Sequence, residues 1–190
     1  MQLAEKQFLS EAEYLAFEEK APFRHEYVGG EAYLMAGGSQ RHNRIAGNAY
    51  IALPQALKGK PCQVFINDVK LHVARDNAYY YPDVMVACSD KASAANESQV
   101  VSDPVLVIEV LSPSTEATDR REKLHAYRHL PSLREYTLVS QENQQVETYR
   151  RQGDLGWLYI TYEPGDMLEL ASVGVTLPIA DLYAGTDIAS

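Results

Sequence analysis

One apolar segment limits the possible folds more than any other part of the chain. Residues 106–111 read Leu-Val-Ile-Glu-Val-Leu, and a turn follows at Ser112-Pro113. A predicted helix over residues 115–129 comes next, and residues 134–139 form another apolar strand. A strand that is apolar on both faces, followed by a helix and a strand, is typical of a βαβ unit in a doubly covered, partly parallel sheet. The sequence therefore predicts an α/β or α+β fold with a central mixed β-sheet flanked by helices.

Short strands and two further helices surround this unit, and no linker interrupts residues 1–190, so we expect one domain. Ser10 and Glu13 form a capping box that opens a helix to about residue 20. Gly29-Gly30 predicts a β-hairpin, and residues 39–57 predict a long helix that Pro54 should kink or end early. Further strands are expected at 64–66, 69–73, 83–87, 145–150, 157–162 and within 167–177, and a polar loop at 89–103.

Composition is ordinary for a soluble globular protein, with 46% hydrophobic and 23% charged residues. The sequence has no apolar run long enough for a membrane helix, and its acidic N-terminus lacks the apolar core of a signal peptide, so we expect a cytoplasmic protein. Cys62 and Cys88 lie far apart without a metal-binding spacing, which predicts buried free thiols.

The charge distribution leaves two interpretations open. A net charge of -9 argues against a generic nucleic-acid coat protein. Residues 120–134 nevertheless contain five arginines or lysines, two histidines and a single acidic residue, Glu122. This segment is either a basic face that meets a nucleic-acid backbone or an ordinary solvated helix face.

Glu109 is the first candidate functional residue, because it lies within the apolar strand. An isolated buried carboxylate costs several kcal/mol or more unless a metal, a cation or a proton neutralises it. The period of two places Val107, Glu109 and Leu111 on one face. Glu109 also lies near the C-terminal end of its strand, where α/β sheets tend to bind ligands.

Asp83 is the second candidate, since it follows Pro82 at the start of another apolar strand. A lone aspartate there is typical of a turn that caps local amides. Together with Glu109 on a neighbouring strand, however, it could chelate one divalent cation, and Mg²⁺ or Mn²⁺ suits oxygen ligands of this kind.

A longer pattern resembles the Uma2 family, a branch of the PD-(D/E)XK restriction-endonuclease-like superfamily. It comprises Tyr81-Pro82-Asp83-Val84, the run Leu106 to Thr115, then Asp119, Lys123 and Tyr127, and residues 131–139. Residues 24–31 (RHEYVGGE) and His42 also resemble that family, and the likeness spans about residues 10–185. The resemblance implies a mixed-sheet core with added β-hairpins.

The resemblance also implies roles for five residues. Asp83 and Glu109 would hold Mg²⁺, and a lysine two positions after the glutamate would orient or activate the attacking water. That position is Leu111 here, so Lys123 becomes the candidate; the alternative is an exposed Asp119–Lys123 pair. Glu26 would add a ligand or hold a second metal, unless it is an exposed hairpin residue. His42 would act on the scissile phosphate or bind metal, unless it is structural.

These observations favour a metal-dependent endonuclease that hydrolyses DNA phosphodiester bonds and contacts the DNA backbone. The alternative is a catalytically inactive nuclease-fold domain that binds nucleic acid or protein, which Leu111 and the acidic composition favour. Family resemblance and 13 tyrosines, a residue type enriched in interfaces, further predict a homodimer.

Overall fold

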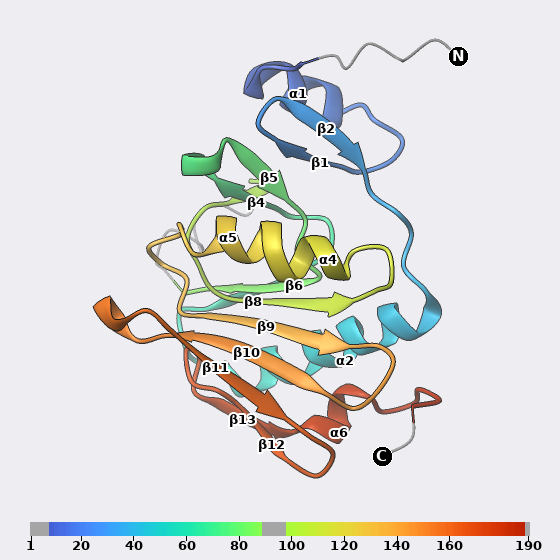
Figure 1. Cartoon of the computed structure of the whole chain (residues 1–190), viewed down its shortest axis with the longest axis vertical. Helices are drawn as coiled ribbons and strands as arrows, with labels where there is room; N and C mark the ends of the chain where they lie inside the picture. The colour runs from blue at the N-terminus through green and yellow to red at the C-terminus, as the bar shows by residue number, and fades with distance from the viewer. Residues whose placement is uncertain (1–7, 89–97, 189–190) are drawn as a thin grey trace.

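A central sheet of six strands organises the computed structural model, which describes residues 8–88 and 98–188 (Figure 1). Within the described part of this sheet only β8 and β9 pair in parallel, and the helix between them makes the crossover, so the predicted mixed sheet is confirmed. The strand order across the sheet is β11 (Trp157–Tyr162), β10 (Val146–Arg151), β9 (Glu135–Ser140), β8 (Pro104–Leu111), β6 (Val84–Ala87) and β3 (Gln63–Ile66).

A second, smaller sheet lies beyond the crossover helix, beside α1 (Glu11–Glu18) (Figure 1). Gly29 and Gly30 both have positive φ, which gives the two-residue hairpin turn its required backbone. The small sheet has the order β2 (Glu31–Leu34), β1 (His25–Val28), β5 (Ala78–Tyr80), β4 (Lys70–Val73) and β7 (Val100–Val101). Residues 100–101 therefore form a strand where a loop was expected, and residues 89–97 of that expected loop lie outside the described residues.

The crossover helix is built from three consecutive segments. These are α4 (Glu116–Thr118), the π-helical turn η2 (Asp119–Lys123) and α5 (Leu124–Tyr127). Short 3₁₀ turns occur at η1 (Ala74–Asp76) and η3 (Gly153–Leu155). On the other side of the central sheet lie α2 (Gln40–Ala56), the hairpin β12 (Met167–Leu170) and β13 (Val175–Pro178), and α6 (Ile179–Leu182).

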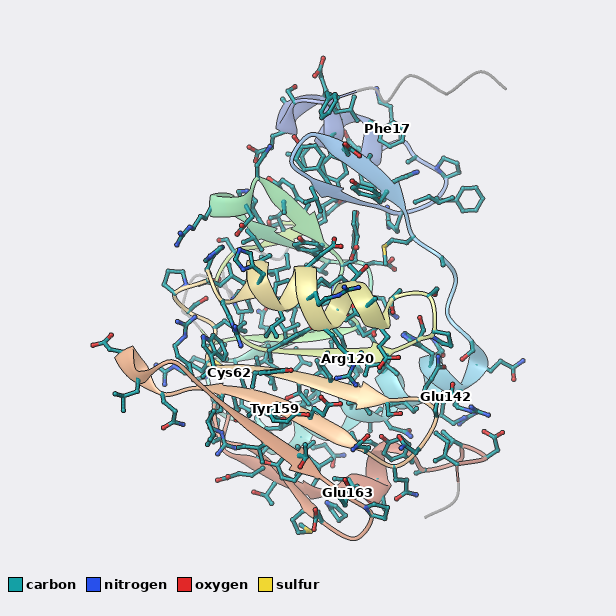
Figure 2. The ribbon with its side chains drawn as sticks, in the orientation of Figure 1. Phe17, Cys62, Arg120, Glu142, Tyr159 and Glu163 are labelled. Carbon is teal, nitrogen blue, oxygen red and sulfur yellow. A yellow bond between two sulfur atoms is a disulfide. The ribbon has the colours of Figure 1, made fainter. Side chains whose placement is uncertain are left out.

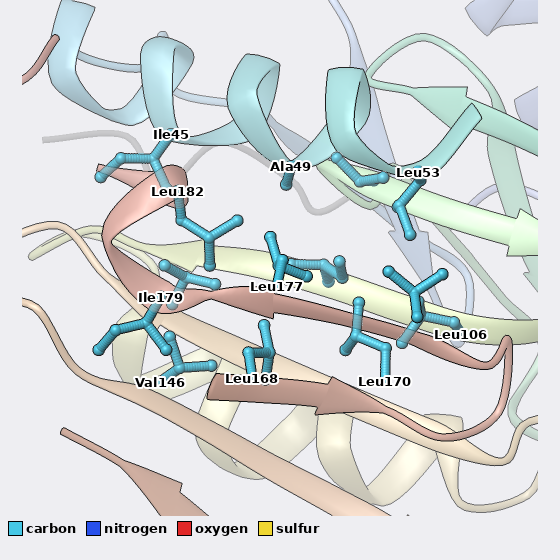
Figure 3. Packing of buried hydrophobic residues seen from close by; sticks show 14 of the residues in the cluster. Ile45, Ala49, Leu53, Leu106, Val146, Leu168, Leu170, Leu177, Ile179 and Leu182 are labelled. Atoms are coloured by element: carbon cyan, nitrogen blue, oxygen red, sulfur yellow. The ribbon is translucent and has the colours of Figure 1, made fainter. Parts of the chain in front are cut away.

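Alternation along β8 divides its side chains between two cores. Leu106, Ile108 and Val110 face the core formed with α2, α6 and the β12–β13 hairpin (Figure 3). Val107 and Leu111 face the core formed with α5 and the small sheet. Burying one such aliphatic side chain stabilises the fold by about 1.5–3 kcal/mol, so β8 is fixed from both sides. Glu109 shares the second face and therefore points toward the crossover helix.

Two expectations about local structure are wrong. Cys62 and Cys88 form a disulfide, and the described residues contain no free cysteine. The reason is the antiparallel register of β3 and β6, in which Gln63 pairs with Ala87. Cys62 precedes Gln63 and Cys88 follows Ala87, so the two cysteines lie opposite each other. Helix α2 also continues to Ala56, so Pro54 does not end it early; the proline removes only one helical hydrogen bond, the one its N–H would have donated to the carbonyl of Tyr50.

Among the described helices, none is both long and apolar enough to cross a membrane.

Candidate active site

The structure brings all five predicted site residues to the junction of the two sheets and the crossover helix. Glu109 comes from β8, Asp83 precedes β6, and His42 lies in the first turn of α2. With Lys123 from η2, they line a cleft of about 240 Å³. Glu26 from β1 lines an adjoining cleft of about 420 Å³, to which Lys123 also contributes.

Glu109 is 3% exposed and is bound by three groups. Its Oε1 accepts hydrogen bonds from Lys123 Nζ at 3.2 Å and from the Tyr127 hydroxyl at 3.0 Å. Its Oε2 accepts one from the backbone N–H of Asp83 at 3.2 Å. Burial raises the pKa of Glu109 to about 8, although the charge of Lys123 opposes that rise.

Lys123 lies at the centre of a group of carboxylates. Its Nζ lies 3.0 Å from Glu26 Oε1, 3.2 Å from Glu109 Oε1 and 3.2 Å from Asp119 Oδ1. Burial alone would lower the pKa of Lys123, but these three carboxylates raise it well above its ordinary value. The lysine is therefore held as an ammonium, a hydrogen-bond donor without acceptor capacity.

The π-helical turn explains why two charged residues of this helix point inward. Asp119 and Lys123 are its first and last residues, and both are buried. Single π turns within helices occur frequently at functional sites, because they change the direction in which side chains project. The Asp119–Lys123 pair is thus a buried part of the site rather than the exposed pair that its spacing also allowed.

Asp83 is tied to the end of β8 and to α2. Its Oδ2 accepts a hydrogen bond from the backbone N–H of Val110 at 2.8 Å and lies 3.2 Å from His42 Nε2. Burial of the His42 ring lowers its pKa, but the hydrogen bond and charge of Asp83 outweigh that effect and leave the pKa above its ordinary value. The backbone carbonyl of Val110 also faces this ring.

The donor set fits a hard divalent cation. Three carboxylates, those of Glu26, Glu109 and Asp119, contact the ammonium of Lys123, and Asp83 lies beside Glu109, so the cluster holds more carboxyl groups than ammonium groups. Asp119 Oδ1 is buried without a hydrogen bond of good geometry within the described part of the chain. The carboxylates supply oxygen donors, which Mg²⁺ and Mn²⁺ prefer.

Leu111 occupies the position where the superfamily pattern has its strand lysine. The side chain is 5% exposed and packs in the core with Met85 and Tyr127. A lysine there would bury a second ammonium among apolar groups, whereas Lys123 reaches the Glu109 carboxylate from the helix.

Sequence reasoning missed two members of the cluster. Asp119 was considered only as a surface partner of Lys123, and Tyr127 only as part of the family-like pattern. The i, i+4 spacing of both from Lys123 was the available signal, because it places all three on one side of the helix. The hydrogen bond from Tyr127 to Glu109 needed the packing of helix against strand to become visible.

The basic segment of residues 120–134 is only partly used by contacts within the chain: Arg120 and Lys123 pair with carboxylates, whereas Arg121, Arg128 and Arg134 are exposed, so both interpretations of this segment stay open. Lys123 belongs to the cleft, and Arg128 lies over the Tyr149 ring. Arg120 makes two hydrogen bonds of 2.6 Å to Glu147 and one of 2.8 Å to Glu116, and it projects between the helix and the central sheet (Figure 2).

Comparison with solved structures defines the fold class. The chain superposes on a crystal structure described as a "putative nuclease belonging to DUF820" from Anabaena variabilis ATCC 29413, with a TM-score of 0.73 and 20% identity. The match covers 93% of this chain and 98% of that one. The chain thus shares the fold of that protein, which agrees with the expected mixed α/β class.

The family follows from sequence comparison. Residues 11–180 match the model of Uma2, described as "Putative restriction endonuclease". Two proteins of Synechocystis sp. (strain ATCC 27184 / PCC 6803 / Kazusa), the uncharacterized proteins slr1290 and sll1609, are each 37% identical. The matches cover 93% and 83% of this chain, and 92% and 89% of those relatives. The protein belongs to the Uma2 family.

Proposed function

We propose that the protein is a metal-dependent endonuclease that hydrolyses DNA phosphodiester bonds, with Asp83 and Glu109 as ligands of Mg²⁺ or Mn²⁺. One observation carries this proposal. The backbone N–H of Asp83 donates to Glu109, and the N–H next to Glu109, that of Val110, donates to Asp83. This reciprocal pair fixes two carboxylates at one edge of the central sheet, beside a charged lysine.

Each residue has a role that follows from its contacts. A bound divalent cation supplies an activated water and stabilises charge on the phosphate oxygens. Lys123 remains an ammonium, so it orients the attacking water by donating a hydrogen bond and does not act as a base. Tyr127 donates a hydrogen bond to Glu109 Oε1 and so helps to hold this carboxyl group in place.

Glu26 and His42 act as positioning residues in this proposal. Glu26 lies 3.0 Å from Lys123 Nζ, which favours a role in placing the lysine over a role as a further metal ligand. His42 contacts Asp83 Oδ2 at 3.2 Å and orients that carboxylate. Both contacts restrict side-chain rotation near the reacting phosphate, which lowers the entropic part of the barrier.

DNA would enter through the cleft rather than along the crossover helix. Small polar side chains line the cleft, namely Asn43, Asn67, Ser112, Ser114 and Thr115. Hydroxyl and amide groups bind phosphate oxygens without reading sequence, so we propose contacts to the DNA backbone. Arg24, at the same cleft, is 43% exposed at its side chain and supplies a cation for them.

Plasmid cleavage tests this function. Supercoiled DNA should be nicked or linearised with Mg²⁺ or Mn²⁺ and left intact with EDTA. Asp83→Asn, Glu109→Gln and Lys123→Met should each lower the rate by at least about 100-fold, the range for removing groups that stabilise transition-state charge. Asp68→Asn is the matched control, because Asp68 lines the same cleft but its side chain is 77% exposed. Equal rates in all four variants would refute the assignment.

We also propose that residues 1–190 form one domain. A homodimer and a cytoplasmic location remain proposals that rest on the sequence. The tyrosine count no longer supports the dimer, because nine of the 13 tyrosines are buried within the chain. The disulfide is also unusual for the cytoplasm, where thiols are kept reduced. Light scattering tests the homodimer, because a monomer mass at micromolar concentration would refute it.

A further inference from the structure

A second cluster of metal-ligating side chains lies away from the cleft, around the C-terminal end of the crossover helix. His125 belongs to α5, and His129 lies in the turn just after the C-cap residue Arg128. Asp76, the last residue of η1, approaches them from the connection between β4 and β5. None of the three lines the cleft that contains Asp83 and Glu109.

The three side chains are already close enough to share one ion. Their ligand atoms all lie within 4.8 Å of one another. His129 Nδ1 is 2.6 Å from Asp76 Oδ2, and the rings of His125 and His129 meet edge to face with centroids 4.8 Å apart. Bonds of about 2.0–2.1 Å in a tetrahedral site imply ligand separations of about 3.3 Å. Side-chain shifts of roughly 1 Å therefore suffice.

Ligand chemistry selects the ion. Two imidazoles four residues apart are a recurrent zinc-binding spacing; here the end of α5 and the turn after it bring them together, and the Asp76 carboxylate completes three protein ligands. Imidazole binds Zn²⁺, Co²⁺, Ni²⁺ and Cu²⁺ but is a poor ligand for Mg²⁺. Arg128, between the two histidines, lies over the Tyr149 ring and is engaged outside the cluster.

We propose that Asp76, His125 and His129 form a second metal site that binds Zn²⁺ or a similar transition ion and excludes Mg²⁺. His125 is exposed, so solvent supplies the fourth ligand. The ion joins η1 to the helix that contains Lys123. The segment η1 connects β4 and β5 of the small sheet, and this sheet also contains Glu26. A bound ion would therefore fix the distance between the small sheet, which contains Glu26, and the helix, which contains Lys123.

Cobalt spectroscopy and zinc calorimetry on the full chain test this site. Asp83→Asn/Glu109→Gln is used as the background, so that the carboxylate cleft does not bind the ion. Co²⁺ should bind one equivalent with visible d–d absorption, and Zn²⁺ should displace it while millimolar Mg²⁺ does not. His125→Ala, at an exposed position, should weaken Zn²⁺ binding at least tenfold, and Asp76→Asn or His129→Ala should do the same.

His72→Ala is the matched control, since His72 stacks on Tyr79 and lies outside the cluster. If the double-variant background does not fold, the same titrations are made on wild type in saturating Mg²⁺. Zinc should then raise the thermal midpoint of wild type and of His72→Ala, but not of His125→Ala. Zinc binding that is unchanged by His125→Ala, or displaced by Mg²⁺, would overturn the proposal.

Discussion

Lys123 Nζ lies 3.2 Å from Glu109 Oε1, although 14 residues and a change from strand to helix separate the two residues. The lysine is held at this carboxylate by the crossover helix, and the strand position two residues after Glu109 is occupied by the buried Leu111. The helix therefore supplies the cation that was expected on the strand, two residues after Glu109.

Removing Lys123 should destabilise the protein strongly. Lys123→Met leaves Glu26, Glu109 and Asp119 without their common cation, and breaking a buried ion pair costs about 3–5 kcal/mol. Urea unfolding at pH 8 with EDTA measures the loss. Adding Glu109→Gln to Lys123→Met should recover at least about 1 kcal/mol, because contacting residues couple by that amount. Strict additivity of the two substitutions would contradict the coupling.

Tyr127→Phe should lower the free energy of unfolding by about 1.5–3 kcal/mol, since it removes a buried hydrogen bond to a carboxylate. Tyr159→Phe is the comparison, because Tyr159 also donates to a carboxylate, that of Glu147, but is 50% exposed. Solvent can replace that bond, so its loss should cost less. Urea denaturation of both variants provides the test, and a smaller effect for Tyr127→Phe would be inconsistent with the structure.

The Arg120–Glu147 pair predicts a pH dependence of stability. Burial would raise the pKa of Glu147, but hydrogen bonds from Arg120 and Tyr159 lower it below its ordinary value of 4.5. The stabilisation is therefore complete above pH 4.5 and is lost as the pH falls through the lower pKa of the folded state. Glu147→Gln should be less stable than wild type by about 1.5–3 kcal/mol at pH 7.

Unfolding at several pH values checks this sign. The difference between wild type and Glu147→Gln should shrink below pH 4.5, where Glu147 becomes protonated in the unfolded state first. A difference that grows on acidification would show that the pair does not stabilise the ionised form.

The disulfide predicts a thiol count and a stability effect. Ellman titration of the unfolded, unreduced chain should find no free thiol, because Cys62 and Cys88 are bonded. Their separation of 26 residues implies that reduction costs about 3.5 kcal/mol, from the entropy regained by the unfolded chain. Two titratable thiols per chain before reduction would restore the expectation of free cysteines.

Much of the fold could be predicted because local patterns determine it. The two-residue period of β8 identified the face of Glu109, and the capping box at Ser10 and the Gly29-Gly30 turn located their elements correctly. Strand periodicity, helix capping and hairpin turns are each determined by residues that lie within a few positions of one another in the sequence.

Relations between distant segments could not be predicted in the same way. The disulfide depends on the register of β3 against β6, and the contact of His42 with Asp83 depends on where α2 packs on the sheet. The separation into two sheets and the ion pairs of Arg120 have the same origin. Pairing of this kind is set by tertiary packing, which a single sequence does not display.

Calorimetric titration with Mn²⁺ tests the central claim most directly, which is that Asp83 and Glu109 together bind a catalytic divalent cation. Wild type and the control Asp68→Asn should bind Mn²⁺, whereas Asp83→Asn and Glu109→Gln should each weaken binding by at least about tenfold, the lower end of the effect of altering a metal site. An absence of binding to wild type, or equal affinity in all four proteins, would contradict the claim.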